Sequence, residues 1–164
     1  MGLSQEQLRR YKRHMKYEEA DQHDLNEIVS LLSSAGLPSE DVGLHLESFV
    51  VARDGGNVVG AVGIQLYGSD ALLRSLVVHP GARGRGISRQ LAQRIVAAAE
   101  RHGVKHLYLL TTTIESLCEK WGFRKIGRKD APEAIKNTAE FKGLCPSVAV
   151  LMYQSVGEII KESI

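Results

Sequence analysis

The chain has 164 residues, of which 43% are hydrophobic, 24% charged and 5% aromatic, so it is long enough for one soluble domain with a substantial core. Its 21 basic and 19 acidic residues give a formal net charge of +2, which favours neither a nucleic-acid nor an anionic-membrane partner. The two cysteines, Cys118 and Cys145, do not make a disulfide framework, and we expect a cytoplasmic protein without a metal site.

The N-terminal segment is polar and basic. It lacks the apolar stretch of a secretory signal, and no apolar run in the chain reaches the ~20 residues that span a bilayer. We expect residues 1–14 to form a helical appendage and residues 15–164 to form a single domain.

Hydrophobic periodicity predicts alternating strands and helices in the first half of this domain. A short strand at Met15–Ala20 precedes an amphipathic helix that begins near Asp21 and ends at Gly36–Pro38. A second short helix is expected at Ser39–Glu47. An antiparallel meander with a hairpin turn at Asp54–Asn57 follows, and its three strands are Phe49–Arg53, Val58–Tyr67 and Ala71–Val78.

The second half begins with a long helix over Gly86–His102 and a strand at Leu107–Leu110. A strand–helix–strand unit of this kind needs a parallel crossover. Thr112 and Glu115 match a capping box that opens a further helix, running to about Trp121. The last expected elements are a strand at Arg124–Arg128, a helix at Ala131–Asn137, a strand at Val148–Tyr153 and a weak helix at Val156–Ile164. The fold class is therefore α/β (α+β), with a mixed, mainly antiparallel sheet, a central parallel pair and helices on both faces.

One loop carries a candidate anion site. It reads Arg83-Gly84-Arg85-Gly86-Ile87-Ser88 and lies directly before the long helix. Glycines allow a sharp turn and a close ligand, and a helix N-terminus offers free N–H groups and the positive end of its dipole, which suits a pyrophosphate. Arg83, Arg85 and Arg89 add positive charge. The alternative is a glycine-rich loop with solvated arginines, and neither a Rossmann nor a P-loop motif fits.

The stretch Val78–Leu91 resembles the acetyl-CoA signature of the GNAT acetyltransferases. The family pattern [Q/R]-x-x-G-x-[G/A] falls on Arg83, Gly86 and Ser88, with serine in place of the usual glycine or alanine. The order of elements over residues 15–153 also resembles this family. The resemblance implies acetyl-CoA as cosubstrate, with its pyrophosphate on the amides of residues 83–88 and its pantetheine along residues 76–78. The implied contacts are Leu76, Val77, Val78, Arg83, Gly84, Arg85, Gly86, Ile87 and Ser88.

The resemblance also implies direct transfer of the acetyl group from the thioester to a neutral amine. Where family members often carry a tyrosine that protonates the leaving thiolate, this chain has Cys118. Cys118 either gives that proton or is a small buried hydrophobe. The acid that some members carry on the strand before the loop is also missing, and Arg74 is the only ionisable group of Leu72–Val78. Arg74 either holds a substrate carboxylate, pairs with a structural acid, or snorkels at a sheet edge.

Three stretches, LLRSLVVHP, LYLLTTT and F-x-x-L-C-P-S-x-A-V-L-M, resemble the ArsN-type acetyltransferases that are encoded with arsenic-resistance genes. The LLTTT–GF stretch is also similar to the acetyltransferase domain of N-acetylglutamate synthases. These resemblances imply a small amino-acid-like amine as substrate, extending to arsenic- or phosphinothricin-like compounds, and they are compatible with a homodimer. The implied substrate residues are Arg74, Ser75, Thr111 and Thr112, with Phe141–Ser147 closing over the substrate.

The missing tyrosine and acid leave a second hypothesis open. The chain could bind acetyl-CoA without catalysis, as a sensor or a partner module. Acetylation of a protein N-terminus or lysine is a third idea, which the near-neutral charge and the lack of an acidic docking run do not support.

Overall fold

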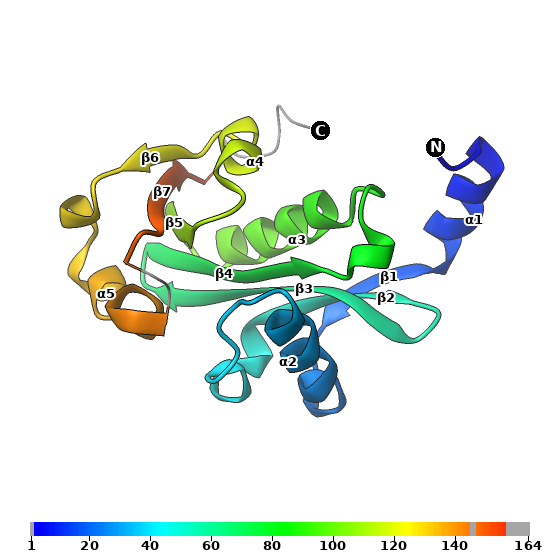
Figure 1. Cartoon of the computed structure of the whole chain (residues 1–164). Helices are drawn as coiled ribbons and strands as arrows, with labels where there is room; N and C mark the ends of the chain where they lie inside the picture. Colours follow the sequence, from blue (N-terminus) through cyan, green and yellow to red (C-terminus); the bar gives the residue numbers. More distant parts are fainter. Residues whose placement is uncertain (1, 145–146, 157–164) are drawn as a thin grey trace.

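The computed structural model describes residues 2–144 and 147–156, and within them one seven-stranded sheet organises the chain (Figure 1). The strand order is β1-β2-β3-β4-β5-β7-β6, and β4 and β5 are parallel while all other neighbours are antiparallel. This confirms the fold class expected from the sequence. The strands are β1 Met15–Glu19, β2 Phe49–Asp54, β3 Asn57–Tyr67, β4 Asp70–Val78, β5 His106–Thr111, β6 Arg124–Ile126 and β7 Val150–Ser155.

Helices cover both faces of the sheet, because each presents one apolar stripe to it. Helix α2 lies on one face of β3 and β4, and α3 lies on the other face, over β2, β3 and β4 (Figure 1). The helices are α1 Gln5–His14, α2 Leu25–Ser34, α3 Ile87–Arg101, α4 Glu115–Lys120 and α5 Glu133–Lys136. Among the described residues, no helix is long and apolar enough to cross a membrane.

Helix α1 confirms the helix expected before residue 15. It lies at the end of β1 and points away from the sheet (Figure 1). The division into an appendage at 1–14 and one domain at 15–164 stays a prediction.

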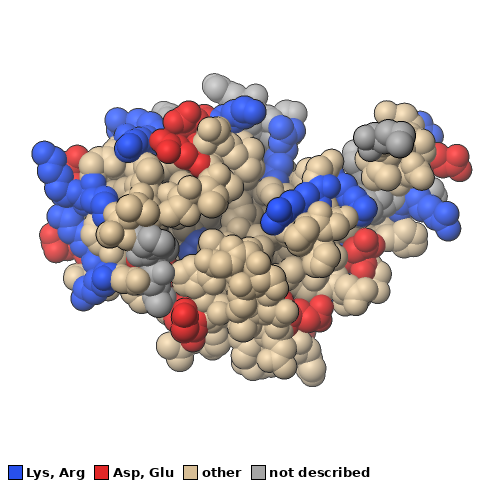
Figure 2. Space-filling model, viewed as in Figure 1, with Lys and Arg blue, Asp and Glu red and all other residues tan. Residues whose placement is uncertain are grey.

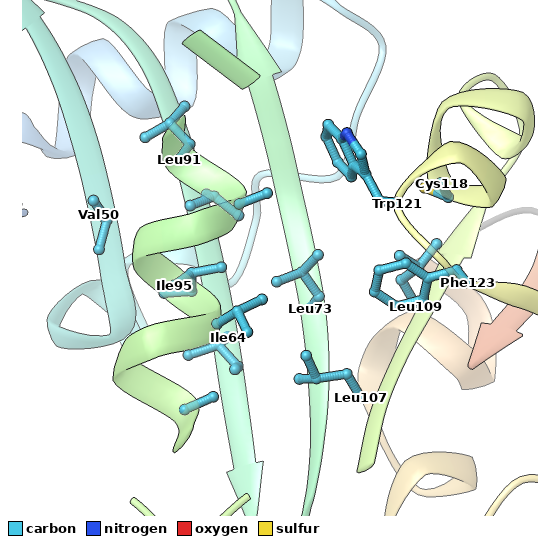
Figure 3. Close-up of a cluster of buried hydrophobic side chains, with 14 of the residues drawn as sticks. Val50, Ile64, Leu73, Leu91, Ile95, Leu107, Leu109, Cys118, Trp121 and Phe123 are labelled. Atoms are coloured by element: carbon cyan, nitrogen blue, oxygen red, sulfur yellow. The ribbon is translucent and has the colours of Figure 1, made fainter. Parts of the chain in front are cut away.

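The larger part of the core lies under α3. Figure 3 shows side chains of β2, β3 and β4 meeting Leu91 and Ile95 of α3, while Cys118, Trp121 and Phe123 extend the same cluster beside β5. Full burial of one such aliphatic side chain stabilises the fold by about 1.5–3 kcal/mol. This packing fixes α4 and the start of α3 against the sheet, and both border the candidate site.

The parallel pair diverges halfway along its length. Strands β4 and β5 pair only from Asp70 to Leu72 within the described chain. Farther on, the register between β3 and β4 slips: Ala61 pairs with Val77, but Gly63 pairs with Arg74. Ser75 lies in this bulge with φ of 59°, a left-handed conformation that is uncommon for a residue other than glycine. A bulge bends and twists its strand, and this one lies on β4 beyond the last residue that pairs with β5, Leu72.

Some local expectations were wrong. Residues 39–47 form two short 3-10 turns, Val42–Leu44 and Leu46–Ser48, in place of a helix, in keeping with their loose periodicity and with Gly43. The capping box at Thr112 is absent from the described structure: α4 begins at Glu115, with Ile114 at its N-cap position.

The last strands also differ from expectation by a few residues. Strand β7 begins at Val150, two residues later than expected, and β6 ends at Ile126. Most of the weak helix expected at Val156–Ile164 lies outside the described residues.

Candidate active site

A continuous groove runs from the start of α3 to the opening between β4 and β5. It consists of three adjoining cavities of about 390, 460 and 330 Å³. The first two share Val78, Arg83, Ser88 and Leu117, and the last two share Leu76, Thr113 and Ile114. Figure 2 shows a hollow on this face between α4 and the loop before α3, with basic side chains at its rim.

The outer end of the groove is the glycine-rich loop. Gly84 and Gly86 have φ of 79° and 78°, which glycine adopts at little cost. Gly86 is the N-cap residue of α3, and no side chain of the described residues caps this end. The first amides of the helix are therefore free to meet an anion.

The arginines of this loop are held by backbone carbonyls. Arg83 Nε donates to the carbonyl of Val78 over 3.3 Å, and Arg85 Nη2 donates to that of Gly81 over 3.3 Å. The structure brings most of the predicted cofactor residues to the two outer cavities: Leu76, Val77, Val78, Arg83, Gly84, Gly86, Ile87 and Ser88, together with Arg89.

The 330 Å³ cavity, called the inner cavity below, is the deep end of the groove. All four predicted substrate residues line it: Arg74, Ser75, Thr111 and Thr112. Thr111 Oγ1 accepts hydrogen bonds from the backbone N–H groups of Thr113 and Ile114, at 3.2 and 3.0 Å. The Thr111 hydroxyl therefore fixes the turn into α4. The sequence had predicted this capping role for Thr112.

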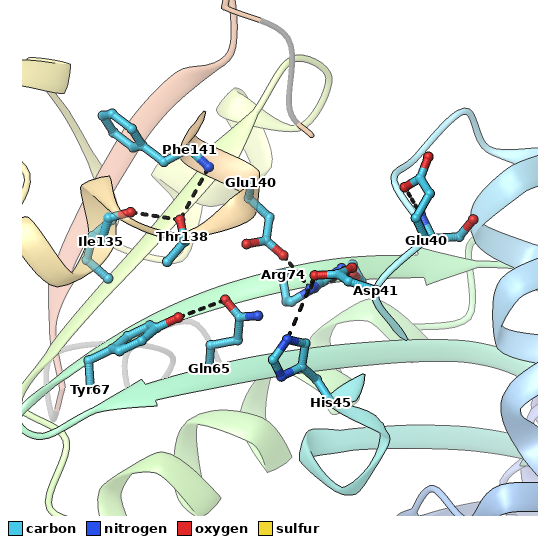
Figure 4. A network of polar contacts seen from close by, with 12 residues as sticks. Glu40, Asp41, His45, Gln65, Tyr67, Arg74, Ile135, Thr138, Glu140 and Phe141 are labelled. Atoms are coloured by element: carbon cyan, nitrogen blue, oxygen red, sulfur yellow. Dashed lines mark hydrogen bonds and ion pairs between the residues drawn. The ribbon is translucent and has the colours of Figure 1, made fainter. Parts of the chain in front are cut away.

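Arg74 is held by two carboxylates at the inner cavity (Figure 4). Its Nη1 and Nη2 donate to Asp41 Oδ2 and Oδ1 at 2.5 and 2.6 Å, and its Nε donates to Ser75 Oγ at 2.9 Å. Nη1 also forms an ion pair with Glu140 Oε1. The pairing with a structural acid, which was one of the alternatives for Arg74, is thus present. A grip of Arg74 on a substrate carboxylate stays a prediction.

The two carboxylates differ in acidity. Burial raises the pKa of Asp41, but its hydrogen bonds to Arg74 and the positive charge of that side chain outweigh burial and bring the pKa below the usual value. Burial also raises the pKa of Glu140, and the Arg74 charge compensates only in part, so this pKa stays above the usual value. Asp41 is therefore the fixed counter-ion of Arg74, and Glu140 is the more basic group.

The sequence did not single out Asp41 or Glu140. Asp41 lies in the loop before the first 3-10 turn, and Glu140 begins the helical turn Glu140–Leu144 after α5. Neither has a spacing to Arg74 that a local pattern could reveal, because the fold brings three distant segments together.

Cys118 lines the inner cavity but is fully buried in the core. Burial raises the pKa of its thiol to about 12, well above the ~8.5 of an ordinary thiol. Such a group is a weak proton donor, and its catalytic role stays a prediction. Cys145 lies outside the described residues.

Residues 45–125 match the family model of the acetyltransferase (GNAT) domain. Over this stretch, from the 3-10 turn before β2 to β6, the chain is similar to the GNAT domain. An uncharacterised N-acetyltransferase of Chlorobaculum tepidum is 30% identical over 97 residues, which cover 58% of this chain and 62% of that relative.

The GNAT fold is also that of several solved structures. The N-acetylglutamate synthase of Neisseria gonorrhoeae, solved with coenzyme A and N-acetyl-glutamate, has a TM-score of 0.77 at 18% identity, over 87% of this chain and 35% of that one. A GNAT acetyltransferase of Staphylococcus aureus has a TM-score of 0.70 at 19% identity, over 87% and 99% of the two chains. At these identities the likeness shows the fold, and this chain spans about a third of the synthase.

Proposed function

We propose that this protein transfers the acetyl group of acetyl-CoA to the amine of a small acceptor. The groove is the observation that carries the proposal, since it joins the α3 N-terminus, which suits an anion, to the inner cavity beside β5. The similarity to the GNAT domain, the relative named as an N-acetyltransferase and the synthase solved with coenzyme A support it.

The residues present fit acetyl-CoA. The free amides after Gly86 and the charges of Arg83 and Arg89 suit its pyrophosphate. The unpaired edge of β4 at residues 76–78 suits the amides of its pantetheine arm. The inner cavity would then receive the thioester, whose acetyl group is the chemistry that acetyl-CoA supplies.

The inner cavity also limits the acceptor. About 330 Å³ must hold both the acetyl end and the reacting part of the acceptor, which favours a small molecule over a folded protein. The likeness to N-acetylglutamate synthase supports an amino-acid-like amine, and the ArsN-like stretches extend the proposal to arsenic- and phosphinothricin-like compounds. A homodimer and a cytoplasmic location stay predictions.

Titration calorimetry with acetyl-CoA tests the first half of the proposal. We expect saturable binding in the micromolar range, and no heat of binding at high micromolar acetyl-CoA would contradict it. The second half is tested by release of free CoA thiol with a panel of L-amino acids, phosphinothricin and arsenic-containing amino acids. We expect at least one of them to release thiol above the rate of acetyl-CoA alone.

A second candidate function is acetyl-CoA binding without transfer. The burial of Cys118, at the position where a proton donor was expected, favours it. Acetyl-CoA binding without thiol release across the whole panel would support this candidate against the enzyme.

A further inference from the structure

Glu140 is a buried carboxylate without a well-aligned hydrogen bond. Its side chain is 4% exposed, and neither carboxylate oxygen accepts a well-aligned hydrogen bond among the described residues. The neighbouring Asp41 carboxyl adds to burial in raising the pKa of Glu140. The ion pair from Oε1 to Arg74 Nη1 is its recorded contact with a cation. A buried carboxylate usually has several donors, because leaving it unpaired costs free energy. Glu140 Oε2 can therefore accept a hydrogen bond that the described residues do not supply.

Glu140 lies where such a donor could arrive. It lines a recess of about 50 Å³ that adjoins the inner cavity. Six of the eight residues that line the recess also line the inner cavity: Leu37, Pro38, Leu73, Arg74, Ser75 and Leu110. The recess has the size of a single small polar group, so it could take the amine end of an acceptor while the rest lies in the inner cavity.

The charges around Glu140 favour a cation. Both terminal nitrogens of Arg74 donate hydrogen bonds to Asp41, so the Asp41 carboxylate compensates most of the Arg74 charge. Two carboxylates then face one guanidinium. Among the described residues, His45 Nε2 lies 3.9 Å from Asp41 Oδ2, and burial and the Glu140 charge raise the pKa of the Tyr67 phenol. Glu40 also lines the inner cavity. When Glu140 is ionised, the two carboxylates outnumber the Arg74 guanidinium, and the cluster attracts an ammonium.

We propose that Glu140 binds the acceptor ammonium through Oε2 and removes one of its protons before the amine attacks. This inference rests on the proposed acetyl transfer and deepens it. The ammonium gives a proton to the carboxylate and becomes a neutral amine. The amine nitrogen forms a bond to the thioester carbonyl carbon, and the C–S bond breaks. The second nitrogen proton goes to the leaving thiolate, which yields CoA thiol and the amide, and Glu140 releases its proton to solvent. In this arrangement Arg74 is a positioning residue, which holds Glu140 through Nη1.

The direct test is Glu140→Gln, which keeps the side-chain shape but cannot take a proton. With an acceptor from the thiol-release panel, we expect kcat to fall by about 100-fold or more, as for a lost general base. Binding of acetyl-CoA should stay within about twofold. The acidic limb of the wild-type profile of kcat against pH should vanish in the variant, and Glu140→Asp should restore part of the rate. The matched control is Glu133→Gln on α5, whose side chain is 84% exposed and which should keep the wild-type kcat.

A binding measurement makes the test independent of finding the natural acceptor. Methylammonium is the smallest alkylammonium probe for the recess, and its binding to the CoA-loaded protein can be followed by NMR titration. We expect wild-type protein to bind it and Glu140→Gln to bind it at least tenfold more weakly.

Three results would overturn the inference: a Glu140→Gln enzyme with wild-type kcat, methylammonium binding that does not depend on Glu140, or a variant that loses stability and acetyl-CoA binding together with rate. The last result would make Glu140 a structural partner of Arg74. Failure of the wild-type protein to bind acetyl-CoA would instead overturn the proposed function, so the two failures are distinct.

Discussion

Arg74 and Asp41 lie 33 positions apart in the chain and are joined by two parallel hydrogen bonds of 2.5 and 2.6 Å. The Arg74 side chain is 3% exposed and that of Asp41 is 13% exposed. This pair ties β4 to the loop that follows α2, beside the inner cavity. The Arg74 guanidinium is therefore held within the fold by Asp41. It also forms an ion pair with Glu140.

Asp41→Asn should lower the free energy of unfolding by about 1.5–3 kcal/mol, because it weakens two charge-assisted hydrogen bonds to Arg74 and leaves Glu140 as the remaining described counter-ion. Denaturant unfolding at pH 7 measures this. Asp54→Asn, at the far end of β2, is a suitable control and should change stability by less than about 0.5 kcal/mol. A loss equal to that of the control would mean that Asp41 does not hold Arg74 in solution.

The pH dependence of stability should differ between wild-type protein and Glu140→Gln. The pKa of Glu140 is raised above its usual 4.5 in the folded state, so the native protein binds more protons than the unfolded chain above pH 4.5. The stability contribution of Glu140 is thus present below pH 4.5 and is lost as the pH rises through the folded pKa. Unfolding at a series of pH values from 4.5 to 8 should show wild type losing stability relative to the variant. Parallel curves would place the Glu140 pKa at its usual value.

Gly86→Ala should weaken acetyl-CoA binding at least tenfold. A side chain at its φ of 78° is strained by about 1–2 kcal/mol, and relief of that strain would move the first amides of α3. Gly68→Ala in the turn between β3 and β4 is the matched control. Its φ is 64°, and a Cβ at either position would meet no described atom within 4 Å. Calorimetry should therefore show equal losses of stability but a change of affinity at Gly86 alone. If Gly86→Ala and Gly68→Ala bind acetyl-CoA with equal affinity, the pyrophosphate does not bind at this loop.

Cys118→Ala should leave kcat within about twofold of wild type, because a thiol with a pKa of about 12 gives up its proton poorly. The folded protein should also react slowly with a thiol reagent at pH 8, at a rate that urea increases. A hundredfold loss of kcat with unchanged acetyl-CoA affinity would instead establish Cys118 as the proton donor to the leaving thiolate.

The sequence by itself determined the order of the strands and helices and the loop at the start of α3. Both are encoded in contiguous residues: apolar periodicity reports which face is buried, and two glycines before a long helix create an anion site without help from distant segments. The fold class and the glycine-rich loop before α3 were therefore predictable.

Only the tertiary structure decided what surrounds Arg74. Its partners come from the loop after α2 and from the turn after α5, and packing of both against β4 sets which charges meet. The bulge at Ser75 likewise depends on the register shift between β3 and β4, and no local sequence pattern predicts this shift. Pairings between distant segments follow from the closed fold. The partners of Arg74, unlike the glycine-rich loop before α3, could therefore not be predicted from the sequence.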